Sequence, residues 1–147
     1  MAPITHSIEI NRPPEAVFTY LDQLDRHGEW QSTIVSSKLD TPGPVGVGTR
    51  ATDKRKVPGG TQDVSYEITE HDPPRRAVFR GTNGPVRPVG SVTVEPVGDG
   101  RSKVTLELDL QGHGLLGMVF GPLARIQARK EVPQDQQRLK ERLEAGT

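Results

Sequence analysis

The side chains that could do acid–base chemistry in this sequence are few and far apart. Its four histidines are His6, His27, His71 and His113, and an imidazole titrates near neutral pH. His6 lies on the apolar face of a strand predicted over 4–10, where it could contact a ligand, act as a base or bind a polar neighbour. His113 precedes a predicted long helix, either at a pocket mouth or in an exposed loop. His27 and His71 fall in predicted surface turns and receive no role.

A tyrosine and an arginine complete the set of candidate polar groups. Tyr66 lies on the same face of a predicted strand as Val64 and Ile68, so it faces inward if they do. It could orient a ligand oxygen or pack as core. Arg129 lies close to the apolar stripe of the predicted long helix. It could pair with a carboxylate or phosphate, or extend into solvent. Sequence spacing links none of these candidates to another, so the catalytic residues are unknown and the sequence leaves open whether the protein is an enzyme.

No metal or cofactor site is expected from the sequence. There is no cysteine, and the histidines lack the paired spacing that brings three or four zinc ligands together. A nucleophile elbow, a phosphate-binding loop followed by lysine, and a dinucleotide fingerprint are also missing.

Composition narrows the possible partners and surroundings. Lys plus Arg and Asp plus Glu are 19 each, which gives no overall field to attract nucleic acid. The first residues have no pattern of a signal peptide, and no apolar run approaches the ~20 residues that span a bilayer. We therefore expect a soluble, cytoplasmic protein without membrane insertion or nucleic-acid binding. The low apolar content of 32% fits either a hollow core or dilution by glycine and proline.

Alternating residues predict an antiparallel sheet. Period-two patterns mark strands over 4–10, 63–69, 90–95 and 104–110, with further extended segments over 34–39, 49–56 and 76–81. A short helix is predicted after the paired prolines Pro13 and Pro14. The basic strand over 49–56 is interpreted as a solvated sheet edge.

The last third of the chain predicts one long amphipathic helix. Leu115, Val119, Leu123 and Ile126 recur at helical spacing. Of these, Val119 and Ile126 are expected to form wall or core, together with Met118. Pro133 predicts a bend, and Pro122 either a second bend or the helix start. Strands followed by a long helix indicate an α+β class in which the sheet packs against helices.

Three segments resemble parts of one family. Residues 8–18, with the sequence IEINRPPEAVF and followed by Trp30, are similar to the opening of polyketide cyclase/dehydrase members of the START-like (SRPBCC) superfamily. Residues 70–76 and the ending over 139–144 resemble later parts of that family. The resemblance implies a single helix-grip domain over 1–147, with about seven curved antiparallel strands around the C-terminal helix and two short helices after the first strand. It also implies an interior space for hydrophobic ligands.

Together these observations predict a binding or carrier protein for a small hydrophobic molecule, lipid-like or polyketide-like, between the sheet and the C-terminal helix. One alternative is a cyclase, dehydratase or aromatase using the same pocket. A second is a protein-interaction module, which an exposed apolar patch near Leu115, Leu116 and Phe120 would favour. Oligomeric state is not indicated. The predicted ligand-binding residues are Tyr66, Phe79, Leu106, Leu108, Met118, Ile126, His6, Trp30 and Arg129.

Overall fold

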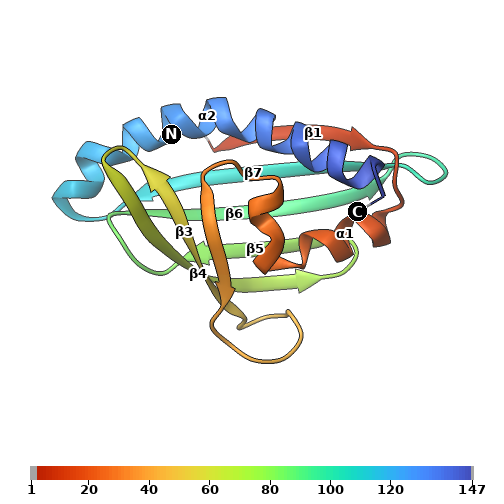
Figure 1. Ribbon diagram of the computed structural model, residues 1–147, viewed down its shortest axis with the longest axis horizontal. Coiled ribbons are helices and arrows are strands. Elements are labelled where there is room, and N and C mark those ends of the chain that lie inside the picture. Colours follow the sequence, from red (N-terminus) through yellow and green to blue (C-terminus); the bar gives the residue numbers. More distant parts are fainter. Residues whose placement is uncertain (1–2, 147) are drawn as a thin grey trace.

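The computed structural model describes residues 3–146 and follows the predicted order of elements (Figure 1). A first strand is followed by a helix and a 3-10 turn, then by six strands and a long helix. The bounds are β1 (Ile4–Ile10), α1 (Pro14–Leu21), η1 (Leu24–Glu29), β2 (Ile34–Leu39), β3 (Arg50–Val57), β4 (Gly60–Asp72), β5 (Arg76–Gly81), β6 (Val86–Pro96), β7 (Ser102–Gly112) and α2 (Gly114–Glu144).

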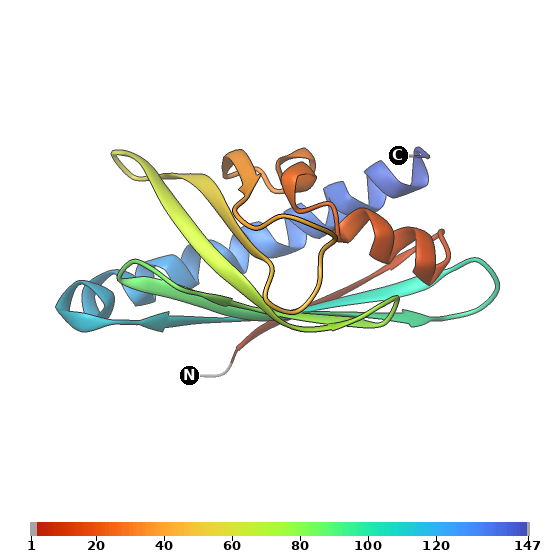
Figure 2. The ribbon, with the colours of Figure 1, turned by 90° about the horizontal axis from the view of Figure 1, so that it is seen from below.

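All seven strands form one antiparallel sheet in the order β1-β7-β6-β5-β4-β3-β2. The sheet is curved, and α1, η1 and α2 lie on its concave side (Figure 2). The prediction that the basic strand forms a sheet edge was wrong, because β3 pairs with both β2 and β4. No helix within residues 3–146 is long and apolar enough to span a bilayer.

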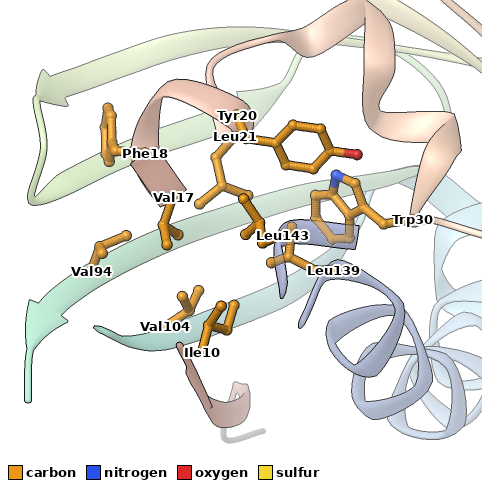
Figure 3. Close-up of a cluster of buried hydrophobic side chains, with 10 residues drawn as sticks. All are labelled: Ile10, Val17, Phe18, Tyr20, Leu21, Trp30, Val94, Val104, Leu139 and Leu143. Atoms are coloured by element: carbon orange, nitrogen blue, oxygen red, sulfur yellow. The ribbon is translucent and has the colours of Figure 1, made fainter. Parts of the chain in front are cut away.

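The main core joins the C-terminal half of α2 to α1 and to the sheet. Leu139 and Leu143 of α2 are almost completely buried and belong to one cluster with Trp30 (Figure 3). Val17 of α1 and Val104 of β7 belong to the same cluster. Burial of these side chains removes apolar surface from water, contributing about 25 cal/mol per Å², and it fixes one end of the molecule.

The first half of α2 packs in a different way. Its buried residues there are Gly117, Gly121 and Arg125. A Cβ atom on Gly117 would lie 2.4 Å from the carbonyl oxygen of Pro85, so the helix meets the end of the sheet backbone to backbone. Only small residues permit this approach, and the large apolar side chains of this half therefore lie on other faces of the helix.

The prediction that Val119 and Ile126 form wall or core was therefore wrong, and the apolar stripe to which they belong is exposed. Leu115, Val119, Leu123 and Ile126 are each more than half exposed. The helix begins at Gly114, so Pro122 is not its start, and both Pro122 and Pro133 lie inside it.

Candidate functional site

The centre of the concave face is built from β4, β5 and β6. Tyr66 on β4 pairs with Gly81 on β5, and Phe79 on β5 pairs with Gly90 on β6. The rings of Tyr66 and Phe79 meet edge to face with centroids 5.7 Å apart. A Cβ atom on Gly90 would lie 2.5 Å from the Phe79 ring. The glycine therefore lets the aromatic ring lie flat across the sheet.

Tyr66 is buried, but its hydroxyl group has no hydrogen-bond partner within the described chain. Its ring packs with Leu24, Ala51 and Ile68. Burial raises the pKa of Tyr66, and the nearby Asp53 carboxylate adds to the effect. The phenol is therefore neutral at physiological pH and can donate a hydrogen bond. An unpaired buried hydroxyl is costly and uncommon.

Close to this phenol, β3 carries a charge pair on the concave side. Asp53 is only 2% exposed and accepts a hydrogen bond of 2.7 Å from the Ser37 hydroxyl. Arg55 lies 3.4 Å from the same carboxylate. The Arg55 guanidinium also donates to Thr33 and Gln31, at 2.8 and 2.6 Å. These partners satisfy both charges, as burial of an ion pair requires.

His27 and Trp30 approach this region from η1 and its C-terminal end. Their rings meet edge to face at 5.3 Å. His27 Nε2 donates to the Leu21 carbonyl at 2.8 Å, and burial lowers the pKa of His27, which keeps the ring neutral. Trp30 is 7% exposed, and its indole N–H has no partner in the described structure. The interior therefore contains two unpaired donors, on Tyr66 and Trp30.

Asp135 brings a further polar group from α2. Its carboxylate accepts a hydrogen bond from the Ser32 amide at 3.3 Å and one from Arg138 at 2.7 Å. Burial raises the pKa of Asp135, and Arg55 is among the charges that oppose this rise. We call Asp53, Arg55, Tyr66, His27 and Asp135 the polar cluster.

Two pronounced hollows open at the surface of residues 3–146. One, of about 390 Å³, is lined by residues of β1, β7 and α2, including Ser7, Lys103 and Gln137. The other, of about 250 Å³, lies at α1 beside Pro73 and Pro74. Neither contains Tyr66 or Phe79. On the concave face, Phe79, Leu106 and Leu108 are half-buried, so this part of the face is partly open to solvent.

The chain is similar to proteins that are already known. It matches the family described as polyketide cyclase/dehydrase and lipid transport over residues 1–144. The chain belongs to this family. It is 27% identical over 130 residues to the uncharacterised protein Rv1546 of Mycobacterium tuberculosis, covering 88% of this chain and 87% of that protein.

Solved structures of other proteins have the same fold. A START superfamily protein from Mycobacterium smegmatis superposes with a TM-score of 0.81 at 12% identity, and the match covers 100% of both chains. The Zhui aromatase/cyclase from Streptomyces sp. R1128 superposes with a TM-score of 0.70 at 15% identity, covering 92% of this chain and 87% of that chain. The predicted helix-grip fold is thus confirmed.

Several predicted ligand-binding residues of this family member lie on the concave side. Tyr66, Phe79 and Trp30 are described above. Leu106 and Leu108 are half-buried on β7, opposite Val92 and Gly90 of β6. Their role in binding remains a prediction.

His6 also points inward, but it has a protein partner. Its Nδ1 donates to Oε1 of Gln136, a residue of α2 that is 1% exposed. The Gln136 amide in turn lies 3.5 Å from the Val104 carbonyl. His6 therefore links β1 to α2. Gln136 is a polar neighbour of the kind considered for His6 from the sequence.

The predicted residues on the first half of α2 lie elsewhere. Met118 is 74% exposed and Ile126 is 54% exposed, and Arg129 is also exposed. The structure thus does not bring these three together with Tyr66 and Phe79. His113, which precedes α2, is also exposed.

Two histidines predicted in surface turns lie in other environments. His71 belongs to β4 and contacts both carboxylate oxygens of Asp22 at 2.9 and 3.0 Å. His27 belongs to η1 and contacts Trp30. Within residues 3–146, no group of three or more His, Cys, Asp or Glu side chains could hold a metal ion.

Sequence reasoning missed the charged part of the polar cluster. Ala51, Asp53 and Arg55 alternate on β3, with Ala51 and Asp53 almost fully buried. The period-two signal was present, but the neighbouring Lys54 and Lys56 suggested a solvated strand. The alternation of one acidic and one basic residue with exposed lysines was the available indication.

Proposed function

We propose that this protein binds a small, largely apolar molecule that carries acceptor oxygens, on the concave face beside Tyr66 and Phe79. The observation that carries the proposal is the buried Tyr66 hydroxyl without a protein partner. A ligand oxygen that accepts from this hydroxyl would remove the cost of leaving the donor unpaired. Membership of a polyketide cyclase/dehydrase and lipid transport family supports a ligand of this class.

The apolar part of such a ligand has a suitable surface. Phe79, Leu106 and Leu108 are half-buried on the concave face, so apolar area remains for a ligand to cover. Each Å² removed from water contributes about 25 cal/mol. Polar groups then set orientation, because small-molecule sites combine apolar walls with few directed hydrogen bonds.

The test compares two probes of similar shape. A dihydroxyanthraquinone carries carbonyl and hydroxyl oxygens, whereas anthracene carries none. Binding of each is measured by quenching of Trp30, the chain's single tryptophan. Tyr66→Phe is expected to weaken binding of the anthraquinone about 2- to 10-fold, which corresponds to the loss of one hydrogen bond. The affinity for anthracene is expected to stay unchanged.

Phe79→Ala supplies the matched comparison, because it removes apolar contact and should lower the affinity for both probes. The proposal fails if neither probe binds, or if Tyr66→Phe weakens the two probes equally. In the second case the hydroxyl would contribute no specific contact to a ligand oxygen.

Cyclase chemistry is a second candidate, favoured by the buried Asp53 carboxylate close to the Tyr66 phenol. Buried charges near a neutral donor are typical of acid–base sites. A carboxylate could take a proton next to a substrate carbonyl while the phenol donates a hydrogen bond to the enolate oxygen. Turnover of a poly-β-ketone thioester that Asp53→Asn abolishes, with the anthraquinone still bound, would establish this candidate over simple binding.

A further inference from the structure

The first half of α2 presents a continuous apolar face to solvent. Val119, Leu123 and Ile126 follow one another at i, i+4 and i+7, so they lie in one row along the helix. The residues that flank this row are exposed as well. The fractional exposures are 83% for Leu115, 61% for Leu116, 74% for Met118, 63% for Val119, 47% for Phe120, 61% for Leu123 and 54% for Ile126. We call these seven residues the α2 face.

The α2 face lies away from the packed side of the helix. The packed side here consists of Gly117, Gly121 and Arg125, and Arg125 is paired with Asp109 at 3.2 Å. Because the sheet contact uses small residues, the large side chains on the remaining surface have no part in the core. A soluble surface rarely exposes so many large apolar side chains together unless something binds them.

Within the helix segment that carries the α2 face, the charged side chains have one sign. Residues 113–130 include Arg125, Arg129 and Lys130 and contain no Asp or Glu, although the whole chain has equal numbers of acidic and basic residues. Lys130 is exposed and continues the row of Val119, Leu123 and Ile126 by one more turn. An apolar row thus ends in basic groups.

A second element at the same end of the molecule has similar character. The turn between β3 and β4 lies at this end in both views (Figures 1 and 2). Val57 there is 37% exposed, and Pro58, Lys54 and Lys56 are exposed. Apolar and basic side chains therefore occur together on two separate elements.

From this arrangement we infer that the α2 face docks on the surface of an anionic lipid bilayer. An interfacial helix of this kind buries apolar side chains at the headgroup boundary while Lys and Arg contact lipid phosphates. A second copy that met this face with its own α2 face, as in a two-fold symmetric dimer, would present the same basic residues and offer no complementary charge. This inference does not depend on the ligand proposed above, because none of its residues belongs to the polar cluster.

The test is co-sedimentation of the full chain with vesicles of phosphatidylcholine, with and without phosphatidylglycerol. The protein is expected to bind the vesicles that contain phosphatidylglycerol and to be released by high salt, which screens surface charges. Arg129→Gln with Lys130→Gln should weaken binding by about fivefold for each charge removed. Val119→Glu with Leu123→Glu should abolish it.

Matched double variants control for general effects of charge. Val35 and Val47 are 52% and 70% exposed outside the α2 face, so Val35→Glu with Val47→Glu adds the same charge elsewhere. Lys38→Gln with Lys103→Gln removes the same charge from other exposed sites. Both controls should bind nearly as the unaltered chain does, and circular dichroism checks that each variant is folded.

Three results would overturn the inference. One is equal binding, or none, to the two kinds of vesicle. Another is an equal loss in the control variants. The third is a stable dimer, seen by sedimentation velocity without lipid, that Val119→Glu with Leu123→Glu dissociates, since a second copy would then be the occupant of the α2 face.

Discussion

At the scale of residues, the two tyrosines of the chain differ in one respect that matters for function. Both are buried, at 3% exposure for Tyr20 and 7% for Tyr66. The Tyr20 hydroxyl donates to Glu29 Oε1 at 2.7 Å, whereas the Tyr66 hydroxyl has no partner in the described structure. The same side chain therefore completes a hydrogen bond in one place and offers a donor in the other.

This difference predicts opposite effects of the same substitution. Tyr66→Phe should raise the free energy of unfolding by about 1 kcal/mol, because it removes a hydroxyl that is buried without a partner. Tyr20→Phe should lower it by about 1 kcal/mol, since Glu29 loses its donor. Urea unfolding of the two variants measures both values. A loss of stability in Tyr66→Phe would mean that the hydroxyl already has a partner in the protein.

The residue types that could be predicted were those with a regular apolar pattern. Tyr66 followed from its place between Val64 and Ile68 on one strand face, and Phe79 followed from the short strand predicted over 76–81. The structure brings their rings together. Asp53 and Arg55 could not be assigned in this way, because charged residues are normally exposed. Their burial is made possible by partners that only the fold supplies, Ser37 from β2 and Gln31 from the loop before β2.

At the scale of elements, α2 combines two kinds of packing in one helix. Its C-terminal half buries Leu139 and Leu143 in the main core, as an amphipathic pattern predicts. Its first half turns Gly117 and Gly121 toward the sheet instead. The sequence pattern identified a helix correctly but not its buried face, because periodicity shows that an apolar stripe exists and does not show what covers it.

The backbone contact of Gly117 leads to a prediction for this element. Gly117→Ala should lower the free energy of unfolding by about 1–3 kcal/mol, because its Cβ would overlap the Pro85 carbonyl and force the helix start away from the sheet. Gly121→Ala is the comparison, since a Cβ there meets nothing within 4 Å. Its change should stay below about 0.5 kcal/mol, because the gain in helix propensity is offset by the restriction before Pro122.

Urea unfolding of these two glycine variants gives the comparison directly. Equal changes in both would show that the alanine effect comes from helix propensity alone. In that case the tight approach of α2 to the β5–β6 turn would not explain why the large apolar residues of the first half are exposed.

At the scale of the whole molecule, strand count and order of elements followed from the sequence, but the distribution of charge did not. Equal totals of acidic and basic residues conceal an acid-free segment over 113–130. A sum over the chain does not reveal this segment, and only the fold shows which of its charges are paired. Arg125 is buried and forms an ion pair with Asp109, whereas Arg129 and Lys130 are exposed beside the α2 face.

The burial of both tyrosines also determines how the molecule as a whole responds to alkali. Burial, with the hydrogen bond to Glu29, raises the pKa of Tyr20 to about 12, and burial raises the pKa of Tyr66 as well. An unfolded tyrosine ionises near pH 10. Above that pH the unfolded chain loses protons that the folded chain keeps, so the free energy of unfolding falls as pH rises.

We therefore expect that the two tyrosines do not affect the free energy of unfolding below about pH 9. Above about pH 10 they should lower it as the pH rises. Because the chain has no other tyrosine, ultraviolet absorbance of tyrosinate reports these two residues alone. The absorbance should rise together with the loss of far-ultraviolet circular dichroism, in one transition. Tyrosinate that forms near pH 10 while the dichroism stays native would show that at least one phenol is accessible in the folded protein, and an accessible Tyr66 would not need a ligand oxygen to satisfy it.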